Sequence, residues 1–196
     1  MANQIETHIE IQLENRNRKT AFFRLILSLP LFAFLYLFQQ FSSGNEWSTL
    51  VLALPVAAAL IVRNVYPSWL LSFNHAVLEF GTRIAAYVLL LTDEYPTFER
   101  NPKIAVIFPD VEGGKKLNRW LPLVKWFLAI PLYIVGFIYS LFAFVALILA
   151  WALTSLSGTY PAWAGELILN TLKFWNRVYG YAVALVTDEY PSFSLN

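Results

Sequence analysis

The sequence contains no cysteine and few charged residues, and each shortage excludes a class of function. Without cysteine the chain has no disulfide, no thiol nucleophile and no thiolate ligand for a metal. Charged residues make up 14% of the chain, against roughly 25% in soluble domains. The formal net charge is +1. With so weak an overall field, and with no basic stripe that carries aromatic residues, the protein is not expected to bind nucleic acid.

Sequence motifs for catalysis and cofactor binding are also missing. The only histidines, His8 and His75, lie far apart without a metal-ligand spacing. There is no glycine-rich phosphate loop, no Gly-x-Ser-x-Gly nucleophile turn and no HExxH zinc motif. The sequence therefore predicts neither an enzyme nor a cofactor or metal site.

Apolar residues dominate what is present. They make up 58% of the chain, and the mean hydropathy is +0.53; soluble domains hold roughly 45–50%. Residues 25–62 contain no Lys or Arg and one acid, Glu46, and residues 126–156 contain no charge. This distribution predicts an integral membrane protein with membrane lipid as its main partner.

Several sequence blocks occur twice in the same order, which indicates an internal duplication. Asn17-Arg18 with Leu29-Pro30 returns as Asn118-Arg119 with Ile130-Pro131, Tyr66-Pro67-x-Trp69 returns as Tyr160-Pro161-x-Trp163, and Thr92-Asp-Glu-Tyr-Pro96 returns as Thr187-Asp-Glu-Tyr-Pro191. The sequence thus predicts two tandem units, residues 1–100 and 101–196.

Each unit is expected to contain a short strand, a transmembrane helical hairpin and an amphipathic helix, which makes the fold an all-α membrane protein with minor β. The alternating residues 5–13 and 103–108 predict strands that pair with each other at the membrane surface. In the first unit a polar break at 42–46 separates two apolar runs. In the second unit, residues 126–156 would form roughly 46 Å of helix against a hydrocarbon core of about 30 Å. We therefore expect a turn near Gly136 to Ser140 or later; one tilted span followed by a bend is the alternative.

The amphipathic helices, expected at 67–92 and 162–187, carry a polar stripe opposite an apolar face. Its candidate functional residues are Glu79, Arg83, Glu166, Lys173 and Arg177. The stripe fits either a helix lying at the membrane surface with its charges in water, or a third span whose stripe faces a bundle interior. Burying an unpaired charge costs roughly 2.5–3.5 kcal/mol on insertion scales, which favours the surface helix. Glu79 and Arg83, four residues apart, are spaced to form an ion pair.

The two Thr-Asp-Glu-Tyr-Pro segments follow these helices and are candidate partner-docking turns. Their residues are Asp93, Glu94, Tyr95, Asp188, Glu189 and Tyr190. Adjacent carboxylates on an extended chain point to opposite sides, so each pair supplies at most one group in one direction. Because the following proline stops a helix, a structural role at the helix exit is favoured over cation binding or docking.

Basic residues flank the apolar runs on the side of the termini and of the central linker, residues 93–119. They are Arg16, Arg18, Lys19, Arg24, Arg63, Lys115, Lys116, Arg119 and Lys125. By the positive-inside bias, the N-terminus, the linker and the C-terminus are expected in the cytoplasm. This topology requires a multi-pass protein with an even number of spans in each unit.

The segments from Asn118-Arg119 to Ile130-Pro131, Tyr160-Pro161, and Arg177 to Phe193 resemble a bacterial membrane-protein family known as a domain of unknown function, DUF4389. The resemblance covers nearly the whole chain in two tandem copies. It implies a location in the bacterial cytoplasmic (inner) membrane and a fold of helices with short amphipathic segments. It implies no reaction.

Three functional hypotheses follow from these features. The first is a non-catalytic scaffold, accessory or membrane-shaping protein that binds lipid and presents its strands and turns to another membrane or cytoplasmic protein. The alternative is a small transporter or channel in which the polar stripes line a path. The weakest is a lipid-processing enzyme, since no residue set specifies a reaction.

Overall fold

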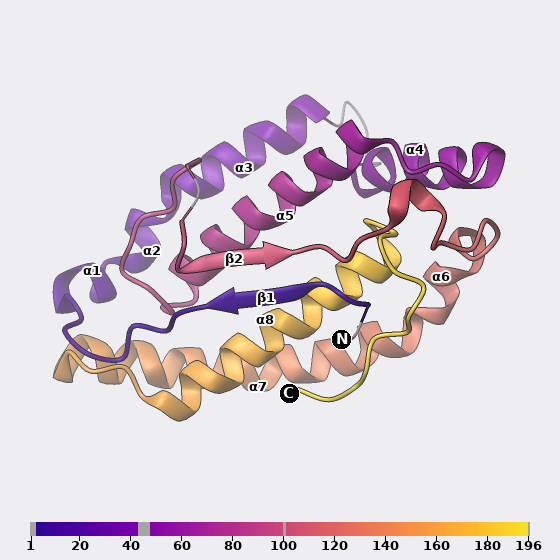
Figure 1. Cartoon of the computed structure of the whole chain (residues 1–196). Coiled ribbons are helices and arrows are strands. Elements are labelled where there is room, and N and C mark those ends of the chain that lie inside the picture. The colour runs from indigo at the N-terminus through magenta and orange to yellow at the C-terminus, as the bar shows by residue number, and fades with distance from the viewer. Residues whose placement is uncertain (1–2, 43–47, 100, 196) are drawn as a thin grey trace.

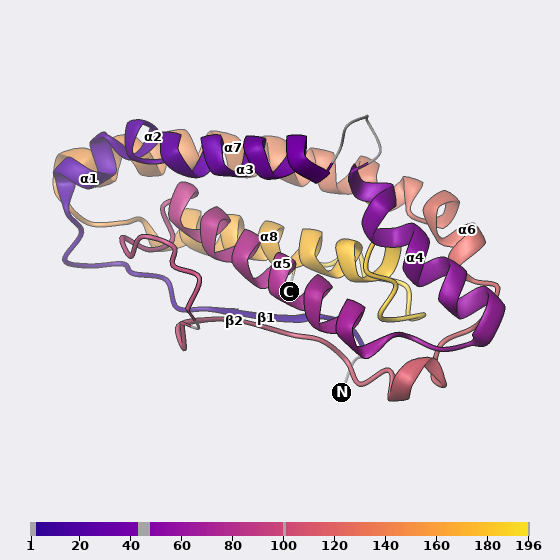
Figure 2. The ribbon, with the colours of Figure 1, turned by 90° about the horizontal axis from the view of Figure 1, so that it is seen from above.

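The computed structural model describes residues 3–42, 48–99 and 101–195, which form a mostly helical protein with one small sheet. This agrees with the expected all-α fold with minor β. Figures 1 and 2 show three layers: a β-ribbon, a middle layer of α5 (Ser68–Val88) and α8 (Ala162–Ala182), and an outer layer that includes α3 (Leu29–Ser42) and α7 (Ile130–Ser157).

The ribbon consists of two antiparallel strands, β1 (Glu6–Ile9) and β2 (Ile104–Ile107), in the register Glu6 to Ile107. Alternation decides which side chains face the helices. Ile9 and Ile104 are buried, whereas Glu6 and Ile107 are exposed. The predicted pairing of the two strands is confirmed.

The amphipathic helices expected at 67–92 and 162–187 are present as α5 and α8, each preceded by a proline in extended conformation. Strand β2 packs on α5 and strand β1 packs on α8, so each strand lies on a helix from the other half of the chain. Between the helices, Asn176 Nδ2 donates to Thr7 Oγ1 (2.9 Å) and to Thr82 Oγ1 (3.2 Å). This contact ties both helices to the ribbon.

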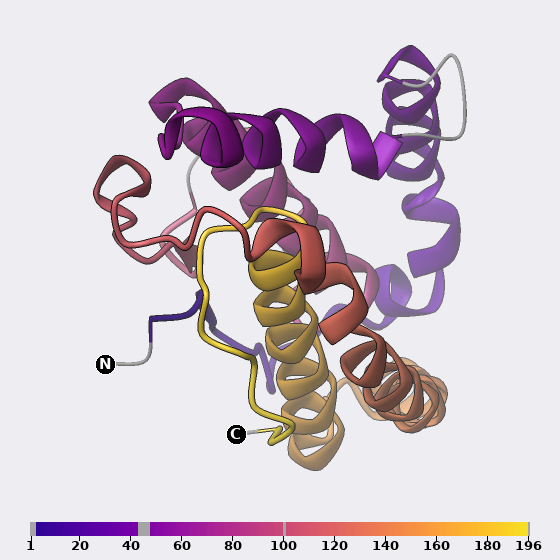
Figure 3. The same cartoon turned by 90° about the vertical axis from the view of Figure 1, so that its right-hand side faces the viewer.

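The outer layer lies on the side of α5 and α8 away from the ribbon (Figure 3). Besides α3 and α7 it contains α1 (Arg18–Phe22), α2 (Arg24–Leu27) and α6 (Pro122–Leu128). Helix α4 (Ser48–Arg63) follows α3 and contacts α6, and α1 packs against α7. Each half of the chain therefore contributes helices that contact the other half in this layer too.

The second half does not contain the predicted hairpin. Helix α7 runs without a break for 28 residues, about 42 Å at the usual helical rise. Gly136 and Ser140, where the turn was expected, lie within α7 and pack against α8 instead. The rings of Trp175 and Phe174 lie against Gly136, and Ser140 Oγ accepts from Trp175 Nε1 (2.9 Å). In the first half α3 and α4 are separate helices, and residues 43–47, which include most of the predicted break, lie outside the described residues.

Gly136 and Gly81 make a matched pair for testing this packing, since both lie inside long helices. A Cβ on Gly136 would approach Trp175 Cζ2 to 2.8 Å and Phe174 Cε1 to 2.9 Å, whereas a Cβ on Gly81 meets nothing within 4 Å. Gly136→Ala is expected to lower the free energy of unfolding by about 1–3 kcal/mol. Gly81→Ala is expected to raise it by about 0.5–1 kcal/mol, the usual gain over glycine in a helix. Denaturant unfolding in detergent measures both, and equal effects would contradict the packing.

Candidate functional site

Asp93, from the first Thr-Asp-Glu-Tyr-Pro segment, points into the protein and pairs with two buried arginines. Its Oδ1 lies 3.0 Å from Arg16 and forms a second ion pair with Arg24, whose side chain is 2% exposed. Arg24 also lies over the ring of Tyr87, 4.1 Å from its centroid. Burial lowers the pKa of Arg16, and the negative charge of Asp93 opposes this shift. Two buried cations thus depend on one carboxylate.

Asp188 forms the corresponding cluster in the second half. It lies 2.7 Å from the ammonium of Lys125, whose side chain is fully buried and which also donates to the Thr187 carbonyl (2.7 Å). Lys125 lies 5.2 Å from the centroid of the Tyr181 ring. Burial lowers the pKa of Lys125, and the hydrogen bond to Asp188 opposes this shift.

Both aspartates also hold the chain before the first helix of their half. Asn17 donates its backbone N–H to Asp93 Oδ2 (3.0 Å), and Asn118 donates its backbone N–H to Asp188. Each asparagine side chain then accepts a backbone N–H two residues later. Each Thr-Asp-Glu-Tyr-Pro segment therefore connects the C-terminal end of a long helix, α5 or α8, to the residues that begin the outer layer in the same half.

The sequence predicted that the two carboxylates of each Asp-Glu pair point to different sides of the chain, and the structure agrees with this. Glu94, Tyr95, Glu189 and Tyr190 are exposed. Glu94 pairs with Lys103 across the surface, and its pKa is lowered, mainly by the hydrogen bond from Lys103. Docking of a partner by the exposed residues of these turns remains a prediction. Asp93 and Asp188 instead make contacts inside the protein.

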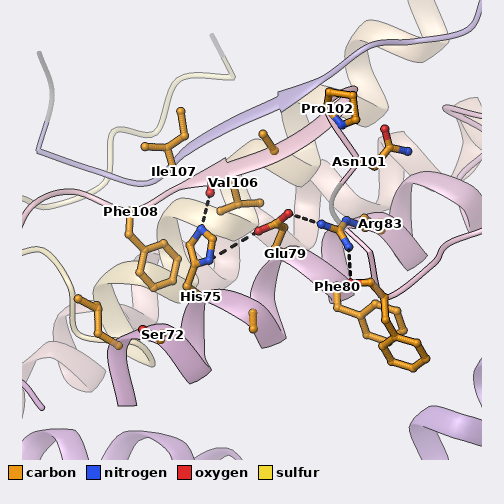
Figure 4. Close-up of a pocket in the computed structure, with 14 residues that line it drawn as sticks. Ser72, His75, Glu79, Phe80, Arg83, Asn101, Pro102, Val106, Ile107 and Phe108 are labelled. Carbon is orange, nitrogen blue, oxygen red and sulfur yellow. Dashed lines mark hydrogen bonds and ion pairs between the residues drawn. The ribbon is translucent and has the colours of Figure 1, made fainter. Parts of the chain in front are cut away.

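Within the polar stripe of α5 the structure brings the predicted residues together. Arg83 forms an ion pair with Glu79, and His75 lies 3.6 Å from the same carboxylate (Figure 4). The other nitrogen of His75 is 2.7 Å from the Val106 carbonyl. Arg83 donates to the carbonyls of Thr97 (3.1 Å) and Glu99 (2.7 Å) in the segment that follows α5. The predicted pair of Glu79 and Arg83 is confirmed.

In α8 the stripe residues are more open. Glu166 is exposed, and Lys173 and Arg177 are half-buried. Arg177 donates to the Ser194 carbonyl (2.7 Å), in the segment that follows α8. The arginines of both stripes thus bind the chain segments that follow their own helices.

A groove of about 980 Å³ runs between α5 and β2, with the His75, Glu79 and Arg83 contacts along it (Figure 4). The rings of Phe80 and Phe98 stack at 4.6 Å on its apolar side. Its charged groups pair with each other and with backbone carbonyls. Among the described residues there is no cluster of three or more His, Asp or Glu side chains suited to a metal ion.

Sequence reasoning missed a reciprocal pair of tyrosine contacts between the halves. The Tyr66 hydroxyl donates to the Ala184 carbonyl (2.6 Å) at the end of α8, and the Tyr160 hydroxyl donates to the Leu89 carbonyl (3.3 Å) at the end of α5. The repeated Tyr-Pro pairs marked these positions in the sequence. Their partners are more than 70 residues away, which local patterns do not reveal.

These tyrosines predict a loss of stability at high pH. Burial raises the pKa of both Tyr66 and Tyr160 to about 12, whereas unfolded tyrosines titrate at about 10. Because the folded state holds these protons more tightly, their stabilisation is complete below about pH 10 and is lost as the pH rises to about 12. Unfolding followed across this range, together with the absorbance of ionised tyrosine, measures the effect. The variant Tyr66→Phe with Tyr160→Phe should lose part of this pH dependence, because burial also raises the pKa of Tyr179 to about 12; an unchanged dependence would contradict the assignment.

The outer layer exposes an apolar surface, which we call the apolar layer. It comprises the large hydrophobic side chains exposed on α2, α3, α6 and α7, among them Leu25, Ile26, Phe127, Phe142 and Leu156. Soluble monomers rarely expose contiguous apolar patches of more than a few hundred Å². By length and composition, α7 is the one helix among the described residues that is able to cross a membrane, and few of its residues are buried.

Comparison of the chain with protein families, with curated proteins and with solved structures finds no match. The resemblance to DUF4389 therefore stays a prediction.

Proposed function

We propose that the chain is a non-catalytic membrane protein that binds lipid through the apolar layer and presents the ribbon and the exposed turn residues to a protein partner. The observation that carries this proposal is the exposure of α7. Its side chains Phe137, Phe142 and Phe144 are each more than 60% exposed. Such apolar surface is favourable only where water is excluded.

The proposed duplication, residues 1–100 and 101–196, is supported by contacts that recur in both halves. The ion pair of Arg24 with Asp93 corresponds to that of Lys125 with Asp188, and the two tyrosine contacts are reciprocal. Because the strands and helices of the halves pack on each other, we propose one interlocked unit rather than two separable domains. A unit with an apolar side and a polar side suits a scaffold or a membrane-shaping protein.

The transporter alternative has less support. Arg83 and Arg177 donate to carbonyls of the segments that follow their helices. Glu79 is neutralised by Arg83. Where α5 meets α8, the side chains of Thr82 and Asn176 are hydrogen-bonded and buried. These hydrogen bonds and this ion pair would have to break before both stripes could line one path.

Reconstitution into vesicles tests the proposed function. Purified protein should float with phospholipid vesicles and change their shape or lipid order, compared with vesicles prepared without protein. Electron microscopy and a lipid-order fluorophore give the readouts. A chain that stays soluble without detergent and leaves vesicles unchanged would overturn the proposal. Uptake of solutes that follows the amount of protein would favour the transporter instead.

A further inference from the structure

We infer that α7 lies in the plane of one membrane leaflet, with the apolar layer in lipid and the β-ribbon in water, so that the described part of the chain enters the bilayer from one side without crossing it. This inference rests on the membrane binding proposed above. It changes the topology predicted from the sequence, which was multi-pass.

The layered packing gives the first argument. Helix α8 packs along α7, and strand β1 packs on α8, so the ribbon extends beside α7 on the far side of the middle layer (Figures 1 and 2). Were α7 to cross the bilayer, the ribbon would lie at the same depth. The exposed Glu6 of the ribbon, and Glu10 and Lys103 directly beside it, would then enter the hydrocarbon, where charged groups are costly. With α7 in the plane, these residues remain in water.

The two faces of α7 give the second argument. Small residues, including Gly136, Ala146 and Ala150, are buried. The opposite face carries Ile134, Leu141, Ile148 and Leu156, all exposed. One uniformly apolar face therefore runs along the whole helix, as an in-plane orientation requires.

The positions of basic residues give the third argument. Exposed Arg18 donates to the Ser157 carbonyl (2.8 Å) at the C-terminal end of α7. Exposed Arg119 lies just before α6, on the N-terminal side of α7, and donates to the Ile61 (2.7 Å) and Val62 (2.8 Å) carbonyls near the end of α4. A spanning α7 would place these arginines on opposite sides of the membrane, against the positive-inside bias. An in-plane α7 keeps both at the headgroups of one leaflet, where anionic phosphates attract them.

The absence of cysteine makes the depth of α7 directly measurable. Four single variants, Ile134→Cys, Leu141→Cys, Ile148→Cys and Leu156→Cys, replace exposed side chains that do not hold the core. Each is labelled with a nitroxide in vesicles of mixed zwitterionic and anionic phospholipid, and its depth is measured from collisions with oxygen and with a water-soluble nickel complex. Glu6→Cys on the ribbon is the control, expected in water.

The in-plane orientation predicts the same depth at all four positions of α7. Shallow ends with Leu141 and Ile148 deepest would show a spanning helix and overturn the inference, although membrane binding would stand. All four labels in water would overturn the proposed function itself. As a second measurement, Lys19→Cys and Arg63→Cys are treated with an impermeant maleimide from outside the vesicles. In a variant that carries both cysteines, molecules with two labels support the inference, and no more than one label on any molecule contradicts it.

Discussion

Asp93→Asn is expected to lower the free energy of unfolding by about 3–5 kcal/mol, the usual effect of removing one partner from a buried ion pair. The carboxylate holds both Arg16 and Arg24, whose side chains are almost fully buried. An arginine does not shed its charge to relieve the loss. Denaturant unfolding in detergent measures the change.

The matching variant Asp188→Asn is expected to lower the free energy of unfolding by less, because it leaves one buried cation without its anion rather than two. That cation is Lys125, and a buried lysine is able to lose its proton. Glu94→Gln is the surface control, since Glu94 and Lys103 are both exposed and such pairs contribute little. If the three variants lost the same stability, the assignment of Asp93 as the main internal anion would be wrong.

Three lysines on the outward face of α7 are expected to abolish binding to vesicles. The variant combines Ile134→Lys, Leu141→Lys and Ile148→Lys, at exposed side chains on the face of α7 opposite its buried small residues. Each lysine brings a charge into contact with lipid hydrocarbon, at a cost of up to about 2.5–3.5 kcal/mol, the insertion-scale value for the centre of the bilayer. Vesicle flotation measures the loss, and circular dichroism checks that the helices persist.

Ile107→Lys is the control for this variant. Ile107 is 55% exposed, similar to Leu141 at 52%, but it lies on the ribbon. Its substitution should leave flotation unchanged. Equal losses from both surfaces would show that the protein does not bind lipid through one side.

The sequence predicted those elements whose signals are local. Alternation located the two strands, and a helical apolar period after Tyr66-Pro67 and Tyr160-Pro161 located α5 and α8. The spacing of Glu79 and Arg83 predicted their ion pair. In each case the interacting residues are near in sequence, or the period itself defines the face.

Features that depend on tertiary packing were missed or misjudged. A turn was expected near Gly136 to Ser140 because residues 126–156 are too long for one straight span, and the sequence does not show that the ring of Trp175 packs there. Arg24 and Lys125 were taken as basic residues flanking the membrane, yet both are buried against aspartates more than 60 residues away. The exchange of contacts between the halves is also invisible to local patterns.

Photolabelling of the unaltered protein from within the bilayer tests the central claim most directly. Vesicles would contain a lipid with a photoreactive carbene precursor near the end of its acyl chain. After irradiation, labelled peptides would be identified by mass spectrometry. We predict labels along the whole of α7 and on α2, α3 and α6, with none on residues 3–14 or 101–118. Labels confined to the middle of α7, or spread equally over the ribbon, would contradict an apolar layer that lies within one leaflet.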